Sequence, residues 1–330
     1  MPMRTCPRLV MMALVLATVT AGLGCTAQSQ QARRDALARE HLETARQYIE
    51  QGLVDSALSA FGMALEENPK LIDAHLGIGE IYREMGDYAR AKNAYESAVE
   101  TDPNNFDANY YLALMRQYLG EVDEAINAYL RALAIDPNNF DANRDIASAF
   151  LQAGRLTEAL PYAVRATHLN GDSQEAWTNL AATYSLLQRY DNAVDAYRQA
   201  AELGELKDPV LLGLADAHIR LENYDRSINV LESLLSRSPS STAYERLGYA
   251  QFKQRDFDLA LKNFRRALAL DDQDTAALNG VGACLMTEYI NGERQERIYR
   301  DQAIAVWRRS VRLRPEQPRI VDLLSRYGRM

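Results

Sequence analysis

The sequence predicts an all-α solenoid of about eight helical hairpins, and three observations support this fold class. The segment Asp-Pro-Asn-Asn-Phe-Asp-Ala-Asn occurs at 102–109 and again at 136–143, which is a period of 34 residues. Four columns of a register with this period hold side chains of similar size in almost every unit. With 10 Pro and 17 Gly in 330 residues, the chain has few residues for the many tight turns of an all-β architecture.

The eight units begin at corresponding positions of this register, near Ala38, Ile72, Phe106, Phe140, Gln174, Asp208, Ser241 and Thr275. Their eighth position is always Ala or Gly, namely Ala45, Gly79, Ala113, Ala147, Ala181, Ala215, Gly248 and Gly282. Their twentieth and twenty-seventh positions are mostly Ala. Their twenty-fourth position is mostly large, namely Phe61, Tyr95, Tyr129, Ala163, Tyr197, Leu231, Phe264 and Trp307.

These columns predict two antiparallel helices in each unit. Helices approach closely only where side chains end at Cβ, so the small columns mark the crossing and the large column fills the space toward the next unit. Glycine between the helices, as at Gly52 and Gly86, suits a turn with positive φ. Proline follows the second helix, as at Pro69 and Pro103, whereas Pro161 is expected in the first turn of a second helix.

The small, small, large, small pattern resembles the tetratricopeptide repeat (TPR) over nearly all of residues 38–315. The resemblance implies a right-handed superhelical solenoid of about eight TPR hairpins. One hairpin cannot bury its own apolar face, so neighbouring hairpins supply the core and the array needs a polar end. Residues 316–330, with apolar Val321, Leu323, Leu324 and Tyr327 among charged residues, are therefore expected to form a C-terminal capping helix.

Residues 1–24 have the pattern of a secretory signal peptide, with a positive start and an uncharged apolar run. The segment that ends at Gly24-Cys25 resembles a bacterial lipobox, although Gly22 stands where Leu is usual. The resemblance implies a lipid on Cys25, a polar tether at 25–37 and a place on the outer membrane facing the periplasm. The alternative is ordinary cleavage after Ala27, which would leave a soluble periplasmic or secreted protein.

The composition argues against several other classes of function. A net charge of −8 disfavours nucleic acid, because that ligand needs clustered cations. Cys6 would leave with the signal and Cys25 would carry lipid, so no intramolecular disulfide remains and Cys284 is expected to be a buried, inert thiol. The four His have no metal-ligand spacing, and no dinucleotide or EF-hand motif is complete. We therefore expect no catalytic residues, metal or cofactor.

In the TPR family, the second, fifth, ninth and twelfth positions of each first helix line a concave inner face. Those positions predict a protein-binding surface that includes Arg46, Leu76, Arg83, Tyr110, Leu114, Gln117, Arg144, Tyr249 and Phe252. Uncovered apolar and aromatic side chains mark a contact surface, and the three Arg suit acidic groups on a ligand. The alternative is that some of these residues pack between neighbouring first helices. The family's carboxylate clamp is not expected, because Leu42 and Arg46 stand where its Lys and Asn would fall.

The resemblance implies a non-catalytic protein–protein interaction scaffold that holds an extended segment or a helix of a partner protein. With the signal and lipobox, it favours an envelope assembly such as pilus or secretin biogenesis, polysaccharide export or outer-membrane assembly. The alternative is a binding or regulatory subunit of an envelope enzyme complex, such as a protease or glycosyltransferase. About nine extra residues near 288–300 are either a tolerated insertion or a functional loop.

Overall fold

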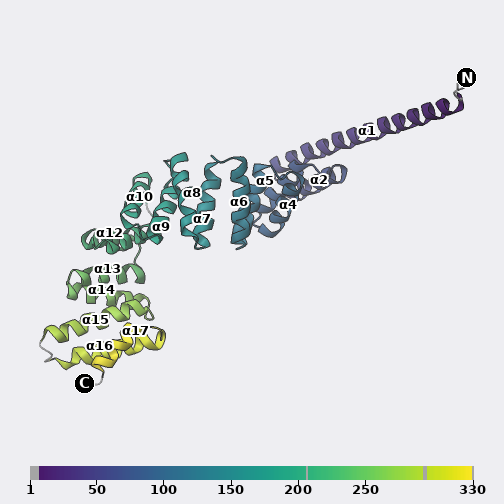
Figure 1. The fold of residues 1–330 in the computed structure, drawn as a ribbon. Coiled ribbons are helices and arrows are strands. Elements are labelled where there is room, and N and C mark those ends of the chain that lie inside the picture. The colour runs from purple at the N-terminus through teal and green to yellow at the C-terminus, as the bar shows by residue number, and fades with distance from the viewer. Residues whose placement is uncertain (1–6, 206, 293–295, 329–330) are drawn as a thin grey trace, which may run out of the picture. The chain divides into compact units, whose positions relative to one another are not determined.

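The structure is a computed structural model that describes residues 7–205, 207–292 and 296–328, with side chains from Gln28 onward. Every regular element in these ranges is an α-helix, 17 helices in all, and the predicted all-α class is confirmed. The helices form two compact units that divide between Gly154 and Arg155, within the fourth repeat (Figure 1).

The first unit contains three complete hairpins and the first helix of a fourth. Its helices are α1 (Pro7–Glu50), α2 (Val54–Glu67), α3 (Ile72–Glu84), α4 (Tyr88–Thr101), α5 (Phe106–Tyr118), α6 (Val122–Ile135) and α7 (Phe140–Gln152). The first helices of the second, third and fourth repeats, α3, α5 and α7, begin at the repeat starts predicted from the sequence.

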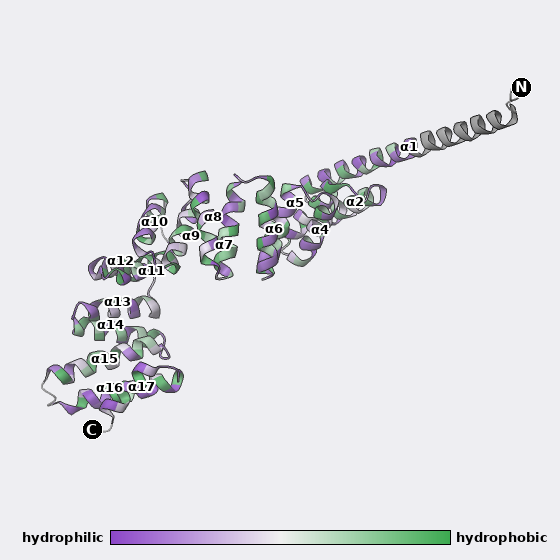
Figure 2. Ribbon diagram, viewed as in Figure 1, coloured by the Kyte–Doolittle hydropathy of each residue, from purple (hydrophilic) through white to green (hydrophobic). Residues whose placement is uncertain are grey.

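The second unit starts with the second helix of the fourth repeat and ends with the cap. Its helices are α8 (Leu156–Leu169), α9 (Gln174–Leu186), α10 (Tyr190–Leu203), α11 (Asp208–Arg220), α12 (Tyr224–Arg237), α13 (Ser241–Lys253), α14 (Phe257–Leu270), α15 (Thr275–Asn291), α16 (Arg297–Leu313) and α17 (Pro318–Tyr327). Hydrophilic and hydrophobic residues alternate along the helices of both units (Figure 2), which is the pattern of helices with one buried side.

The repeated segment at 102–109 forms the entry to α5 through a set of local hydrogen bonds. Asn105 caps the helix by accepting from the backbone N–H of Ala108 at 2.9 Å. The buried amide of Asn109 donates back to the carbonyls of Pro103 and Asn105, at 2.9 and 2.8 Å. The same bonds recur at 136–143, so these side chains serve the turn between repeats.

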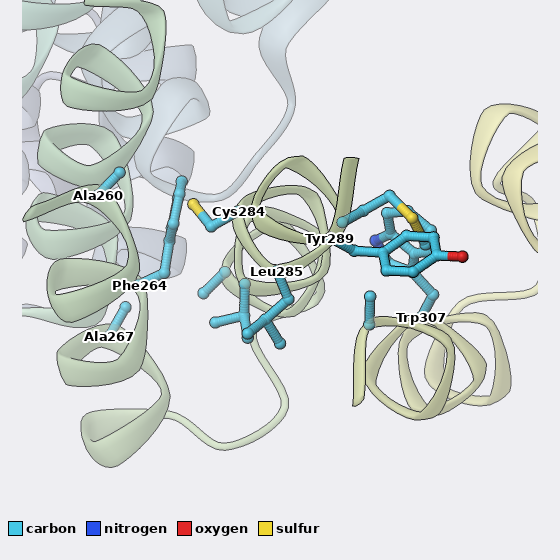
Figure 3. Close-up of a cluster of buried hydrophobic side chains, with 11 residues drawn as sticks. Ala260, Phe264, Ala267, Cys284, Leu285, Tyr289 and Trp307 are labelled. Carbon is cyan, nitrogen blue, oxygen red and sulfur yellow. The ribbon is translucent and has the colours of Figure 1, made fainter. Parts of the chain in front are cut away.

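The small and large columns pack against each other as the register predicts. A Cβ atom added at Gly79 would lie 2.7 Å from the ring of Tyr95, and one at Gly282 would lie 2.2 Å from Trp307. Around α15, the rings of Phe264 and Trp307 flank a cluster that includes the buried Cys284 (Figure 3). Burial raises the pKa of the Cys284 thiol to about 12, which keeps it protonated at neutral pH.

One local expectation, the position of Pro161, needs correction. Pro161 is the sixth residue of α8 rather than part of its first turn, so the helix forgoes one internal hydrogen bond there. In the cap helix, which forms as predicted, Val321 is 46% exposed. The other apolar residues of α17 pack against the terminal core cluster, which also includes Tyr289 and Trp307.

The insertion in the last repeat lengthens both of its helices. α15 and α16 have 17 residues each, whereas the first helices from α3 to α13 have 13 and the second helices from α2 to α14 have 14. Tyr289 occupies the position where earlier repeats turn, and α15 continues through it to Asn291. Residues 293–295 of the insertion lie outside the described residues.

The predicted tether at 25–37 lies within α1, so it is helical in the structure. Its last residues contact the second helix of the first repeat: Arg34 donates to the Glu66 carbonyl at 2.9 Å, and Asp35 accepts from Asn68 at 3.1 Å. The side chain of Cys25 and those of the predicted signal peptide lie outside the described residues. Among the described residues, no helix combines the length and the apolar character needed to cross a membrane.

Candidate protein-binding surfaces

Two hollows lie over first-helix positions that the sequence assigned to the inner face. One is in the first unit and involves α1, α3 and α5; the other is in the second unit and involves α13, α15 and α17. In the described part of the chain, no group of three or more His, Cys, Asp or Glu side chains is arranged to hold a metal ion.

The α1–α3–α5 hollow has a volume of about 330 Å³. Its lining residues are Arg46, Ile49, Phe61, Asp73, Leu76, Gly77, Glu80, Tyr95, Asp107 and Tyr111. Two residues of the predicted surface, Arg46 and Leu76, meet here. Asp73, Glu80 and Asp107 occupy the same inner columns, but the predicted surface lacks them because it was defined by apolar and basic side chains.

Each of the three predicted Arg already has a carboxylate partner within the chain. Arg46 lies 3.5 Å from Asp73, and the Nε of Arg83 donates to Glu80 at 3.3 Å. Arg144 pairs with Asp141 at 2.8 Å and with Asp145 at 2.7 Å. A ligand carboxylate would therefore have to replace an internal carboxylate at each of the three guanidinium groups.

Tyr110 is a packing residue between first helices rather than a free anchor. Its hydroxyl donates to Asp145 Oδ2 at 2.8 Å, and this bond joins α5 to α7. Its ring lies 5.1 Å from that of Tyr111 and 6.0 Å from that of Tyr129. Burial and the nearby Asp145 carboxylate raise the pKa of Tyr110, so the hydroxyl stays a donor.

The other two predicted residues of α5 differ in their roles. Gln117 accepts a hydrogen bond from the Tyr129 hydroxyl at 2.9 Å, so its amide is used in packing. Leu114 is half-buried on the same helix. The alternative of packing between neighbouring first helices therefore describes Tyr110, whereas Gln117 bonds to the second helix of its own hairpin.

The α13–α15–α17 hollow is larger, with a volume of about 550 Å³, and it brings Tyr249 and Phe252 together. Tyr249 is 38% exposed. Phe252 is half-buried, with its ring 5.3 Å from Phe257 of α14. Beside these two α13 residues, apolar residues of α15, α17 and the core line the hollow, namely Phe264, Ala276, Gly280, Ala283, Trp307, Pro318, Ile320 and Leu323.

Charged groups surround this apolar lining. Lys253 and Arg319 both line the hollow and are exposed. Glu245 also lines it but is buried and pairs with Arg246, which pairs in turn with Asp216 at 2.7 Å. Arg319 is absent from the predicted surface because the cap helix lies outside the repeat register.

The fold and these hollows define a class of protein: a stack of helical repeats whose first helices present an extended surface, as protein-interaction scaffolds do. A family model described as "Cilia and flagella-associated protein 70 C-terminal domain" matches residues 11–281. The chain belongs to this family of TPR domains.

Solved structures with the same fold have low sequence identity to the chain. A tetratricopeptide repeat protein from Parabacteroides merdae has 18% identity and a TM-score of 0.52, over 76% of this chain and 99% of its own. The pilF protein of Pseudomonas aeruginosa has 19% identity and a TM-score of 0.52, over 67% and 99%.

The Cut9–Hcn1 hetero-tetramer of the APC/C gives a TM-score of 0.54 at 17% identity, and the match covers 87% of this chain and 55% of that one. Identities at this level support the TPR fold alone. No curated protein sequence matches the chain.

Proposed function

We propose that the chain is a non-catalytic scaffold of the bacterial cell envelope that holds a segment of a partner protein on its inner face. The observation that carries this proposal is the α13–α15–α17 hollow. There Tyr249 and Phe252 stand beside an apolar lining that is open to a ligand. Exposed aromatic side chains over an apolar pocket are typical anchors of protein interfaces.

The proposed partner segment is extended or helical, because the inner-face positions recur along the chain of first helices. Contacts shared between successive repeats then add up along the segment. Arg46, Arg83 and Arg144 of the first unit pair with carboxylates of the chain itself, so the aromatic anchors of the second unit contribute most of the binding free energy. An envelope assembly is the proposed setting, supported by the signal and lipobox pattern that ends at Cys25.

Photo-crosslinking in intact cells tests the proposal. A photoreactive amino acid at Tyr249 or at Phe252 should give a discrete crosslinked product with a partner protein, which mass spectrometry can identify. Both positions border the hollow, so both should capture the same partner.

The matched control is the same photoreactive amino acid at Asp258, an exposed residue of α14 outside the hollow. The proposal predicts no product, or a different one, from this position. A partner captured from Asp258 and from neither Tyr249 nor Phe252 would refute an inner-face mechanism.

A further inference from the structure

Two cations border the α13–α15–α17 hollow without a carboxylate partner among the described residues. Lys253 closes α13, and its Nζ lies 5.8 Å from the centre of the Tyr249 ring. Arg319 is the second residue of the cap helix. By contrast, Arg309 of α16 pairs with Asp272 at 2.7 Å and Arg326 of α17 pairs with Asp322 at 2.8 Å.

The one carboxylate among the described residues that line the hollow is not available to a cationic ligand. Glu245 is only 6% exposed and already pairs with Arg246. Burial raises the pKa of Glu245. A ligand cation would have to be buried to reach this carboxylate, and the desolvation of that cation is costly. The hollow therefore presents two free positive groups to a ligand and no free negative group.

The surrounding sequence strengthens this positive character. Residues 296–330 contain nine Arg, no Lys and four acidic residues, in a chain whose 45 acidic residues outnumber its 37 basic ones. Arginine forms paired hydrogen bonds with a carboxylate and is enriched at protein interfaces. Such a local reversal of charge also attracts negatively charged partners from a distance.

The apolar lining requires a second feature of the ligand. Gly280 lets the Phe264 ring approach so closely that a Cβ atom would lie 2.4 Å from it, and Leu323 of the cap helix faces the same space. A small inorganic anion would leave this apolar surface uncovered. A peptide with an apolar side chain between acidic residues would cover the lining and satisfy the cations together.

We propose that the α13–α15–α17 hollow binds an acidic peptide segment of a partner protein. An apolar side chain of the segment packs beside Tyr249 and Phe252, and its flanking carboxylates pair with Lys253 and Arg319. The cap helix α17 is thus part of the binding site as well as the end of the core. This inference rests on the proposed function and specifies the chemistry of the partner.

A displayed library of short random peptides, selected on the purified chain, tests the charge preference. Bound peptides should be enriched in Asp and Glu next to apolar residues, and a photoreactive group at Tyr249 should crosslink to them. The double substitution Lys253→Glu, Arg319→Glu should weaken the selected peptides by about tenfold or more, because attraction becomes repulsion. The affinity for the unaltered chain should fall as salt is added.

The matched control is Lys262→Glu, Arg326→Glu, which makes the same change in net charge at exposed residues of α14 and α17 that do not line the hollow. It should leave the affinity within about twofold, because exposed ion pairs contribute little. Circular dichroism of each variant verifies that it is folded.

The possible outcomes separate the two proposals. Peptides that crosslink at Tyr249 without any enrichment in acidic residues, or that bind the two double variants equally, overturn this inference but leave the scaffold function intact. Selection of basic or purely apolar peptides does the same. The absence of any crosslink at Tyr249, both to library peptides and in intact cells, overturns the scaffold function as well.

Discussion

Gln188, Glu222 and Arg255 adopt the left-handed backbone at the turn between two helices, with φ of 59°, 59° and 68°. Earlier repeats have glycine at the same position, as at Gly86, where φ is 75°. For a residue with a Cβ atom this conformation costs about 1–2 kcal/mol. All three side chains are exposed, so packing does not compensate for the cost.

We predict that Arg255→Gly raises the free energy of unfolding by about 0.5–1 kcal/mol. The gain is the relief of strain, less the larger chain entropy that glycine has in the unfolded state. The reverse change, Gly86→Ala, should lower it by about 0.5–1 kcal/mol, because the same two terms enter with opposite sign. Urea unfolding followed by circular dichroism measures both, and a lower midpoint for Arg255→Gly would contradict the argument.

Tyr110 and Tyr249, which the sequence assigned to the same predicted surface, have different roles in the structure. We predict that Tyr110→Phe lowers the free energy of unfolding by about 1 kcal/mol, because Asp145 loses its hydrogen bond to the hydroxyl. Tyr110→Ala should cost about 2–4 kcal/mol, since it also empties the space among the neighbouring rings. The same urea titration tests this prediction. If both variants are as stable as the parent chain, Tyr110 is not a packing residue.

Tyr249→Ala should separate binding from stability. Tyr249 is 38% exposed and lines the hollow, so its loss should change the free energy of unfolding by no more than about 0.5 kcal/mol. Loss of an aromatic anchor should weaken partner binding by about 1–3 kcal/mol. The affinity for the partner and the urea midpoint of this variant test the prediction. An affinity equal to that of the parent chain would contradict it.

Among the elements, α17 depends most on its contacts with the rest of the chain. It has 10 residues, none of them fully buried, and a helix of this length is marginal by itself in water. Gln317, just before it, connects the cap to α15 and α16. Its side chain donates to the carbonyls of Ser310 and Arg314 and accepts from Asn279 at 2.7 Å.

We predict that Gln317→Ala loosens the cap helix, at a cost of about 1–3 kcal/mol for the hydrogen bonds removed. Amide exchange in residues 318–327 should then be faster, while exchange in α13 and α14 is unchanged. Hydrogen–deuterium exchange measured by mass spectrometry is the direct test. Unchanged exchange in α17 would mean that its apolar contacts suffice to hold it.

At the scale of the whole molecule, α1 connects the first repeat to the segment that carries Cys25. The lipobox pattern predicts that Cys25 is acylated and that the chain is held at a membrane by this lipid. Cys25→Ala should abolish labelling by a fatty-acid analogue and release the chain into the soluble envelope fraction. Labelling that persists in the variant would remove the lipoprotein proposal and leave the scaffold proposal untouched.

The sequence by itself determined the hairpins and most of the helix starts and turns of this protein, although α1 begins at Pro7, well before the predicted repeat start near Ala38. Each repeat contacts mainly its neighbours, so local features such as the Asn105 cap, the Gly86 turn and the small columns are sufficient to specify its structure. Only the tertiary structure decided which inner-face side chains are free. Tyr110 and Asp145 lie 35 residues apart, and Lys253 and Arg319 come together only because the cap helix folds back beside α13 and α15. A 34-residue register shows which column a residue occupies, but the pairing of charges between columns depends on side-chain geometry in the packed array.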